Sequence, residues 1–129
     1  MEKLANQELQ IRRVKTHDIS AISEIEQACF KDPFPSYFLS QLADANPDTF
    51  LVAVSEERIV GYAVVDRWPD QEHLVSIAVL PGSRKMGVGQ ALLDNLVEKT
   101  QSGKMMLEVR RSNRAALDLY RKNGFTQTG

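Results

Sequence analysis

Hydrophobic and polar positions follow two different periods along this chain, and the changes between them mark out the expected elements. Leu9–Val14 alternates as a strand does, after a polar tail over residues 1–8. A three-residue recurrence then predicts a helix that begins behind N-cap candidates at Thr16–Asp18 and ends near Phe30. Its apolar stripe consists of Ile19, Ile22, Ile25 and Cys29. We therefore expect a strand followed by an amphipathic helix, with Cys29 packed in the core.

Prolines separate this helix from a second one. Asp32–Ser36 contains two prolines two residues apart, which cannot both lie inside a helix, so the sequence predicts a loop there. A second helix is predicted over Ser36–Ala45, with its apolar residues on one face, and Asn46–Asp48 ends it.

From Phe50 onward the period becomes that of extended chain. Phe50–Val54 and Ile59–Val65 favour strands, and Ser55–Arg58 between them predicts a hairpin. Leu74–Leu80 is apolar almost throughout, which is typical of a central strand covered on both faces.

The last third of the chain alternates between helix and strand. Residues 88–96 predict a helix, Met105–Val109 a strand and Asn113–Lys122 a final helix. Gly124 is expected to stop that helix, and Phe125 to open another strand. The order β-α-α-β-β-β-α-β-α-(β) predicts a mixed sheet with helices on its faces, of α/β or α+β class, with a right-handed parallel crossover.

Composition places the chain among ordinary globular proteins. It has 129 residues, 43% of them hydrophobic and 26% charged, which fits a single domain over residues 1–129. Sixteen Lys and Arg against seventeen Asp and Glu give a net charge of −1, whereas nucleic-acid-binding proteins usually carry a basic excess. The longest apolar runs, Ile59–Val65 and Leu74–Leu80, are far shorter than the roughly 20 residues of a membrane span. We expect a cytoplasmic protein that binds neither nucleic acid nor membrane, and its single cysteine fits a reducing compartment.

The first candidate for chemistry is the glycine-containing segment Arg84–Gly89, between a buried strand and a helix. Glycines let the backbone approach a ligand closely, and the free N–H groups of a helix N-terminus favour anions. Arg84 and Lys85 add positive charge at the same end. The segment fits either a cradle for a pyrophosphate or a tight turn with two solvated cations.

Two further residues carry groups suited to proton transfer. Glu108 lies inside the apolar strand 105–109, where burial would raise the pKa of a carboxylate toward the working range of a general base. Ordinary alternation, with Glu108 on a solvent-exposed face, explains the same local pattern. Tyr120 combines an apolar ring with a hydroxyl that can donate a proton, although most such tyrosines are core residues.

Asn113 is an N-cap candidate or a ligand contact. No cluster of residues has the spacing of metal ligands, so no metal is expected.

Together these segments resemble the GNAT superfamily of N-acetyltransferases. Ile77–Pro81 followed by Arg84-x-x-Gly87-x-Gly89 is similar to the acetyl-CoA-binding motif of that superfamily. A second series resembles, more narrowly, the ribosomal-protein alanine N-acetyltransferases of the RimI type, and consists of Leu107–Arg110, Ser112–Asn113, Leu119–Tyr120 and Gly124–Phe125. Phe30–Phe34 is similar to the substrate-side loop of that subfamily, and the resemblance runs from about residue 11 to residue 125.

The resemblance implies a fold and a role for each matching residue. The fold is a mostly antiparallel sheet with a central parallel β-α-β unit that binds the coenzyme. Backbone groups of Ile77, Ala78 and Val79 would bind the acetyl-pantetheine arm of acetyl-CoA. The pyrophosphate would lie in the loop formed by Arg84, Lys85, Met86, Gly87, Val88 and Gly89. Glu108 matches the general base, Tyr120 the general acid and Asn113 a contact to coenzyme A.

The implied activity is direct transfer of acetyl from acetyl-CoA to the N-terminal α-amine of a protein, with a ribosomal protein as the favoured acceptor. Direct transfer needs a base and an acid but no covalent enzyme intermediate. Two alternatives stay open: a lysine or small-amine acetyltransferase of the same superfamily, and an acyl-CoA-binding module without turnover. The chain is expected to be a monomer or a homodimer.

The sequence departs from the family pattern at its end. Family members continue past Gly124–Phe125 with further strands, whereas this sequence stops at Gly129, so its C-terminal strands are expected to be shortened. A truncated chain, a short family member and a sheet completed by a partner's strand are all consistent with this ending.

Overall fold

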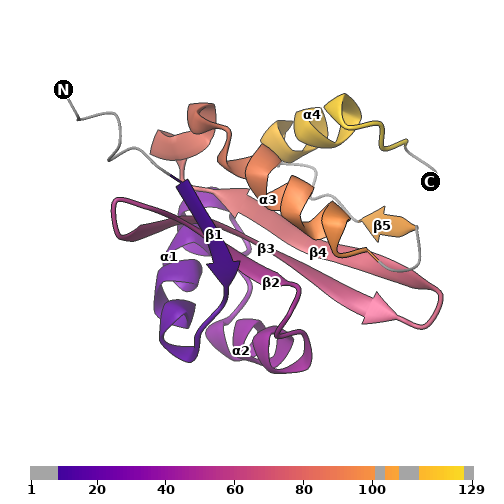
Figure 1. Cartoon of the computed structure of the whole chain (residues 1–129). Helices are drawn as coiled ribbons and strands as arrows, with labels where there is room; N and C mark the ends of the chain where they lie inside the picture. The colour runs from indigo at the N-terminus through magenta and orange to yellow at the C-terminus, as the bar shows by residue number, and fades with distance from the viewer. Residues whose placement is uncertain (1–8, 101–103, 108–113, 127–129) are drawn as a thin grey trace.

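A five-stranded sheet lies at the centre of the computed structural model, which describes residues 9–100, 104–107 and 114–126 (Figure 1). Its strands are β1 (Leu9–Arg13), β2 (Phe50–Ser55), β3 (Arg58–Trp68), β4 (Gln71–Val79) and β5 (Met105–Leu107). The helices are α1 (Ile19–Cys29), α2 (Ser36–Ala45), α3 (Val88–Glu98) and α4 (Arg114–Lys122). The strands lie in chain order; β1 to β4 pair antiparallel, and β5 pairs parallel to β4. The predicted mixed, mostly antiparallel fold with a parallel β-α-β unit is confirmed.

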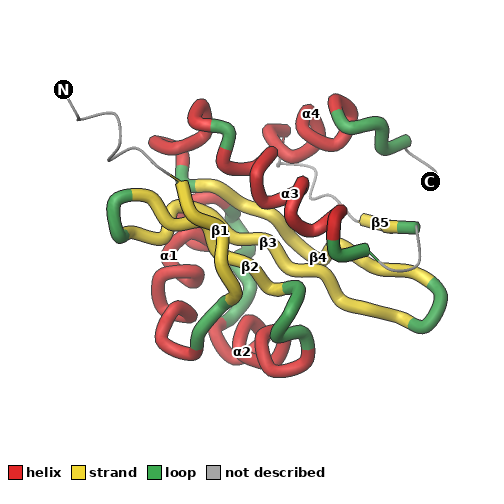
Figure 2. Tube along the Cα trace, in the orientation of Figure 1, coloured by secondary structure: helices red, strands yellow, loops and turns green. Residues whose placement is uncertain are grey.

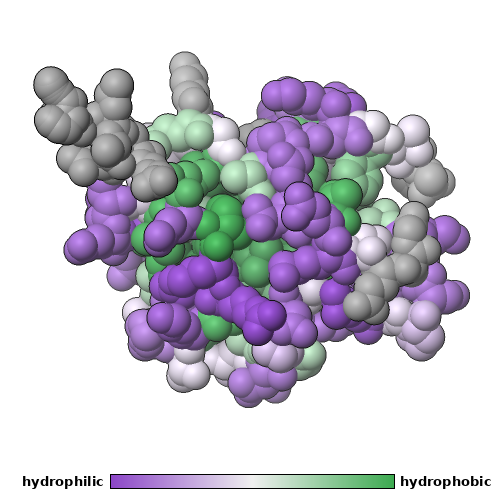
Figure 3. All heavy atoms as spheres, viewed as in Figure 1, coloured by the Kyte–Doolittle hydropathy of each residue, from purple (hydrophilic) through white to green (hydrophobic). Residues whose placement is uncertain are grey.

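Helices cover both faces of the sheet. In Figures 1 and 2, α1 and α2 lie on one face, and α3 and α4 on the other. The strand side chains divide accordingly: along β2, Leu51 and Ala53 pack on the α3 side, and Phe50 and Val52 on the α1–α2 side. On the face seen in Figure 3, hydrophobic side chains gather in the middle and polar ones surround them. Coverage on both faces explains why the central strands have nearly continuous apolar runs.

The β2–β3 hairpin follows the predicted turn, and the β3–β4 hairpin extends beyond the predicted strands. Glu56 and Glu57 both have positive φ, 51° and 67°, as a two-residue hairpin turn requires. β3 continues to Trp68 and β4 begins at Gln71, and these two residues face each other at the far end of the hairpin. The sequence prediction was too short there because polar residues interrupt the apolar run, whereas the backbone pairing continues through them.

The end of α4 confirms one prediction and overturns another. Gly124 has a φ of 87° and stops the helix, as expected. Its N–H donates to the carbonyl of Arg121, and the N–H of Phe125 donates to the carbonyl of Tyr120, which is the Schellman pattern of helix termination. Phe125 and Thr126 lie outside any strand, so the predicted strand opening at Phe125 is wrong. The cap turns the chain back, and the ring of Phe125 packs on that of Tyr120 with centroids 5.8 Å apart.

Candidate functional site

A cavity of about 280 Å³ opens where β4 meets the start of α3. β4 contributes Ile77, Ala78 and Val79, and the segment leading into α3 contributes Arg84, Gly87, Gly89 and Gln90. α4 adds Ala116, Leu119 and Lys122, while the end of α1 supplies Cys29 and Phe30. The structure thus brings together six of the residues that the sequence analysis assigned to coenzyme binding: three on β4, and Arg84, Gly87 and Gly89.

The backbone of β4 faces the cavity through Val79. The N–H of Leu80 donates to the carbonyl of Val60 on β3 over 2.8 Å, so the adjacent residue Val79 directs its backbone groups to the opposite edge of the strand. At that edge the described part of β5 pairs with β4 only at Glu72–Leu74. The carbonyl of Val79 instead accepts hydrogen bonds from Arg84 Nε over 3.0 Å and from Cys29 Sγ over 3.4 Å.

The turn into α3 is built around a glycine. The short helical segment Pro81–Met86 ends at Gly87, whose φ of 75° is strained for any residue with a side chain. A Cβ built on Gly87 meets no atom within 4 Å, so the space beside the turn is open. Gly89 serves packing instead, because a Cβ there would lie 3.2 Å from Leu119 Cδ2 on α4.

Positive charge and helix geometry favour an anion at this turn. The first amide groups of an α-helix have no carbonyl partner within the helix, and α3 begins at Val88 directly behind the cavity-lining Gly87. Arg84 and Lys122 add two cations to the wall. These features fit the pyrophosphate of a nucleotide coenzyme.

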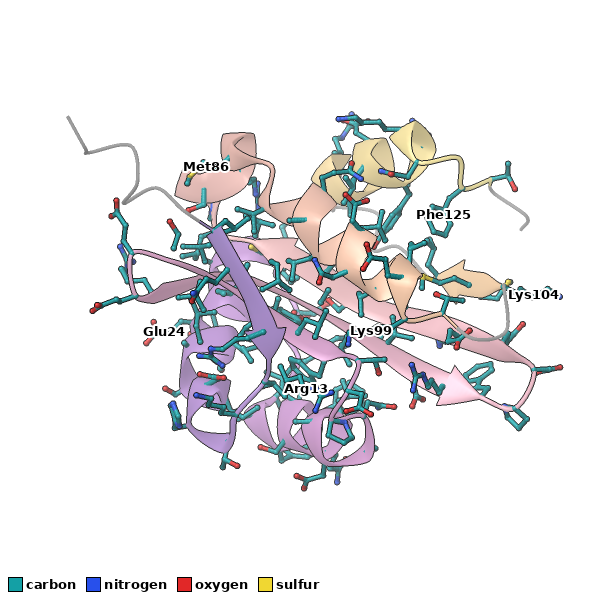
Figure 4. The ribbon with its side chains drawn as sticks, in the orientation of Figure 1. Arg13, Glu24, Met86, Lys99, Lys104 and Phe125 are labelled. Atoms are coloured by element: carbon teal, nitrogen blue, oxygen red, sulfur yellow. The ribbon has the colours of Figure 1, made fainter. Side chains whose placement is uncertain are left out.

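The other predicted coenzyme residues have different positions. Val88 is fully buried in the core beneath α3, and Met86 is exposed at the outer side of the helical segment, away from the cavity lining (Figure 4). Lys85 belongs to the same Pro81–Met86 segment. Asn113 and the predicted base Glu108 lie outside the described residues.

Tyr120, the predicted acid, lies in the core between α4 and the sheet. It is 4% exposed, and its ring contacts that of Phe125, which Figure 4 shows between α4 and β5. Burial raises the pKa of Tyr120 above its ordinary value, so its phenol stays protonated at neutral pH. Three described side chains of α4 line the cavity: those of Ala116, Leu119 and Lys122. Tyr120, the residue after Leu119, is not part of the lining.

The sequence analysis missed part of the cavity wall. Cys29 is half-buried and packs beside the α1 core, as expected, but it also lines the cavity. Lys122 was not singled out, although a cation at the C-terminal end of a predicted helix was a visible signal. Within the described ranges no three His, Cys, Asp or Glu side chains come together as metal ligands would. None of the described helices combines the length and the apolar character that a membrane span requires.

Comparison with known proteins identifies the family of this chain. The acetyltransferase (GNAT) family matches residues 19–125. The chain belongs to the GNAT family. Its enzyme class, an acetyl-CoA-dependent N-acetyltransferase, agrees with the prediction from the sequence.

Individual GNAT relatives cover most of the chain. The N-alpha-acetyltransferase RimI of Mycobacterium tuberculosis is 32% identical over 87% of this chain and 75% of its own length. The ribosomal protein bS18-alanine N-acetyltransferase of Escherichia coli is 30% identical over 91% of this chain and 80% of its own. Among solved GNAT structures, Ard1 from Thermoplasma volcanium superposes with a TM-score of 0.87 at 27% identity, covering 94% of this chain and 84% of that one.

Proposed function

We propose that this chain acetylates the N-terminal α-amine of a protein, and that a ribosomal protein whose N-terminal residue is alanine is its favoured acceptor. The observation that carries the proposal is the cavity that joins the β4 edge, the α3 N-terminus and Arg84. Relatives named as N-alpha-acetyltransferases and as a ribosomal-protein alanine N-acetyltransferase support the choice of acceptor.

The described residues fit the coenzyme in shape and in charge. The open space beside Gly87 admits a bulky group, and Arg84 and Lys122 match the charge of a pyrophosphate. The backbone of Ile77–Val79 would hold the pantetheine arm as an added strand, and the Arg84–Gly89 loop would hold the phosphates. Asn113 is proposed as a further coenzyme contact. When bound, acetyl-CoA supplies an acetyl group already activated as a thioester.

The chain's own residues would then move two protons. Glu108 would accept a proton from the acceptor's ammonium group, directly or through water, because only the neutral amine is a nucleophile. Tyr120 would donate a proton to the departing thiolate. The phenol of Tyr120 is protonated at neutral pH, as a donor must be, while burial, by raising its pKa, makes that proton harder to give up.

Turnover by two single variants tests these roles. We expect Glu108→Gln and Tyr120→Phe each to lower turnover by about 10²-fold or more while acetyl-CoA affinity stays nearly constant, because each removes one proton-transfer group. The measurement is steady-state release of coenzyme A with a panel of N-terminal peptides, beside calorimetric titration with acetyl-CoA. Glu98→Gln, which neutralises an exposed carboxylate at the end of α3, is the control. Unchanged turnover in both test variants contradicts the assignments.

The position of the acetyl group identifies the acceptor. Fragmentation of product peptides by mass spectrometry separates α-acetylation from ε-acetylation. Products modified on lysine would replace the proposal with a lysine acetyltransferase. Binding of acetyl-CoA without turnover on any acceptor would replace it with a non-catalytic binding module.

A further inference from the structure

The side chain of Arg84 is folded back onto β4 in the wall of the cavity. Its Nε donates to the carbonyl of Val79 over 3.0 Å, and its Nη2 donates to Cys29 Sγ over 3.4 Å. The thiol of Cys29 donates in turn to the same carbonyl over 3.4 Å. All three residues line the cavity, so these contacts lie inside the space proposed for the coenzyme.

The guanidinium of Arg84 has a defined position although the residue is exposed. Arg84 belongs to the short helical segment Pro81–Met86, and an exposed arginine loses rotamer freedom when it is held in one geometry. Hydrogen bonds to two different groups offset part of that loss, because the planar guanidinium presents its N–H groups in a fixed fork. The structure therefore places this guanidinium on the edge of β4.

This position conflicts with both tasks that the proposed function gives to this wall. A carbonyl oxygen has two lone pairs, and the oxygen of Val79 already accepts from Arg84 and Cys29. A pantetheine arm added to β4 as a strand needs that carbonyl for its amide N–H, because the backbone groups of Val79 face away from β3. A pyrophosphate needs the charge of the same guanidinium. Neither task is met while Arg84 stays on Val79.

The two tasks are linked because one side chain must give up one partner to take the other. A phosphate is a stronger partner for a guanidinium than a neutral carbonyl is, because both sides of the hydrogen bond are then charged. Arg84 therefore leaves Val79 more readily for a thioester that carries a diphosphate. A thioester without phosphate must compete for Val79 while Arg84 is still in place.

We propose that Arg84 is a specificity-determining residue that opens the β4 edge only to thioesters that carry phosphate. Its guanidinium closes the carbonyl of Val79, with Cys29 as a second anchor, until a phosphate takes it away. This inference rests on the proposed function, because the contact matters only if acetyl-CoA lies along β4 in this cavity. To the attraction of charge it adds a selection against short thioesters such as acetyl-pantetheine.

Acetyl-pantetheine, which lacks the diphosphate, tests the proposal with Arg84→Met. We expect its Kd, measured by NMR titration, to fall about three- to tenfold in this variant, because a competing hydrogen bond to Val79 is gone. The Kd of acetyl-CoA should rise about tenfold, because the attraction to phosphate is gone as well. If Arg84 only attracted phosphate, the acetyl-pantetheine Kd would not change, and if it only supported the wall, that Kd would rise. Either result overturns the proposal.

Two further variants separate the hydrogen bond from the charge. Arg84→Lys keeps the charge but removes the Nε–H that bonds Val79, so acetyl-pantetheine should again bind more tightly while the acetyl-CoA Kd stays within about threefold. Lys122→Met is the matched control, because it removes a cation that lines the same cavity from α4. It should weaken acetyl-CoA and leave the acetyl-pantetheine Kd unchanged. An equal gain for acetyl-pantetheine in Lys122→Met overturns the role of Arg84.

Inorganic pyrophosphate tests the same exchange of partners in the unsubstituted chain. At saturation it should draw Arg84 from Val79, so the acetyl-pantetheine Kd is expected to fall about threefold or more, with no such fall in Arg84→Met. Independent binding of the two probes to the unsubstituted chain overturns the proposal. Failure of the proposed function looks different, because the unsubstituted chain would then bind no acetyl-CoA, and that result overturns this inference with it.

Discussion

Asp18 shows how one side chain fixes the path from the first strand into the first helix. Its buried carboxylate accepts hydrogen bonds from Arg12 Nη1 over 2.8 Å, Arg12 Nη2 over 3.1 Å and the N–H of Lys15 over 2.7 Å. Burial opposes its ionisation, but these hydrogen bonds and the positive charge of Arg12 outweigh burial and hold the pKa of Asp18 below its ordinary value. The charged form is therefore the one that stabilises the fold.

Stability should accordingly fall in acid. Because the folded pKa of Asp18 lies below the unfolded value of about 3.8, its contribution is complete above that value. The contribution is then lost as pH falls through the folded pKa. We expect Asp18→Asn to lower the free energy of unfolding by about 1–3 kcal/mol at pH 7 and to flatten its decline between pH 5 and pH 2. Urea denaturation at several pH values measures both effects.

Asp48→Asn is the control for this prediction. Asp48 Oδ1 pairs with Arg13 Nη1 over 3.3 Å, and both side chains are more than half exposed. Exposed pairs contribute little, so a change below about 0.5 kcal/mol is expected. Equal effects at Asp18 and Asp48 would contradict the argument from burial.

At the residue scale the sequence predicted backbone requirements better than side-chain partners. The glycines of Arg84–Gly89 indicated a backbone turn, as a ligand cradle or as a plain tight turn, and Gly87 does form a turn with positive φ and free space beside it. The buried carboxylate of Glu26 was not noticed, although it falls four residues after Ile22 on the apolar face of α1. Its partners, Phe34 and Tyr62, come from distant parts of the chain, and one sequence does not show which distant residues meet.

At the element scale, the packing of α3 on β3 leaves no room for a side chain at Gly61. A Cβ built on Gly61 would be 3.0 Å from Val88 Cγ1, 3.1 Å from the carbonyl oxygen of Ala78 and 3.4 Å from Leu92 Cδ1. A side chain of α3 can shift by a few tenths of an ångström, but the carbonyl belongs to a paired strand and has little freedom. The glycine therefore sets the distance between the helix and the sheet at the edge of the cavity.

Gly61→Ala should push α3 outward. We expect a loss of about 1–3 kcal/mol in the free energy of unfolding, because the added methyl group overpacks this contact. The variant should also bind acetyl-CoA more weakly, since α3 begins at Val88 next to the cavity. Thermal denaturation and calorimetric titration measure the two effects. Gly82→Ala, where a Cβ meets nothing within 4 Å, should change neither. A Gly61→Ala protein as stable as the unsubstituted chain would show that α3 adjusts freely.

Element boundaries were predictable wherever a local signal marked them. Pro35 and Asn46 enclose α2, whose predicted bounds, Ser36–Ala45, are those observed. The ends of β3 and β4 were missed because strand pairing, and not hydrophobic pattern, sets them. The strand expected at Phe125 was wrong because the helix cap and the contact with Tyr120 use the residue after Gly124 instead.

At the scale of the whole molecule, ligand binding and stability should be coupled. A ligand that binds only the folded chain adds about 2.7 kcal/mol of stability at a hundred times its Kd, so acetyl-CoA should raise Tm. Gly87→Trp should fill the open space of the cradle and reduce that rise, with a weaker Kd in calorimetric titration. Gly124→Trp is the control, because it imposes a similar backbone strain, at φ 87°, outside the cavity lining. Acetyl-CoA should raise the Tm of that variant as much as it raises the Tm of the unsubstituted chain. An unaltered acetyl-CoA affinity in Gly87→Trp would count against the cradle.

The order of the strands also bears on how the molecule assembles. β2, β3 and β4 pair through two short turns, so their contacts form between near neighbours in the chain and close at small entropic cost. The whole of α3 lies between β4 and β5 in the chain, so the pairing of β5 with β4 joins residues that are far apart in sequence. From this topology we expect the meander to form first and the α3–β5–α4 layer last. The cavity lies on the seam between these two parts, so we expect the enzyme to gain its coenzyme site at the final step of folding and to lose it at the first step of unfolding.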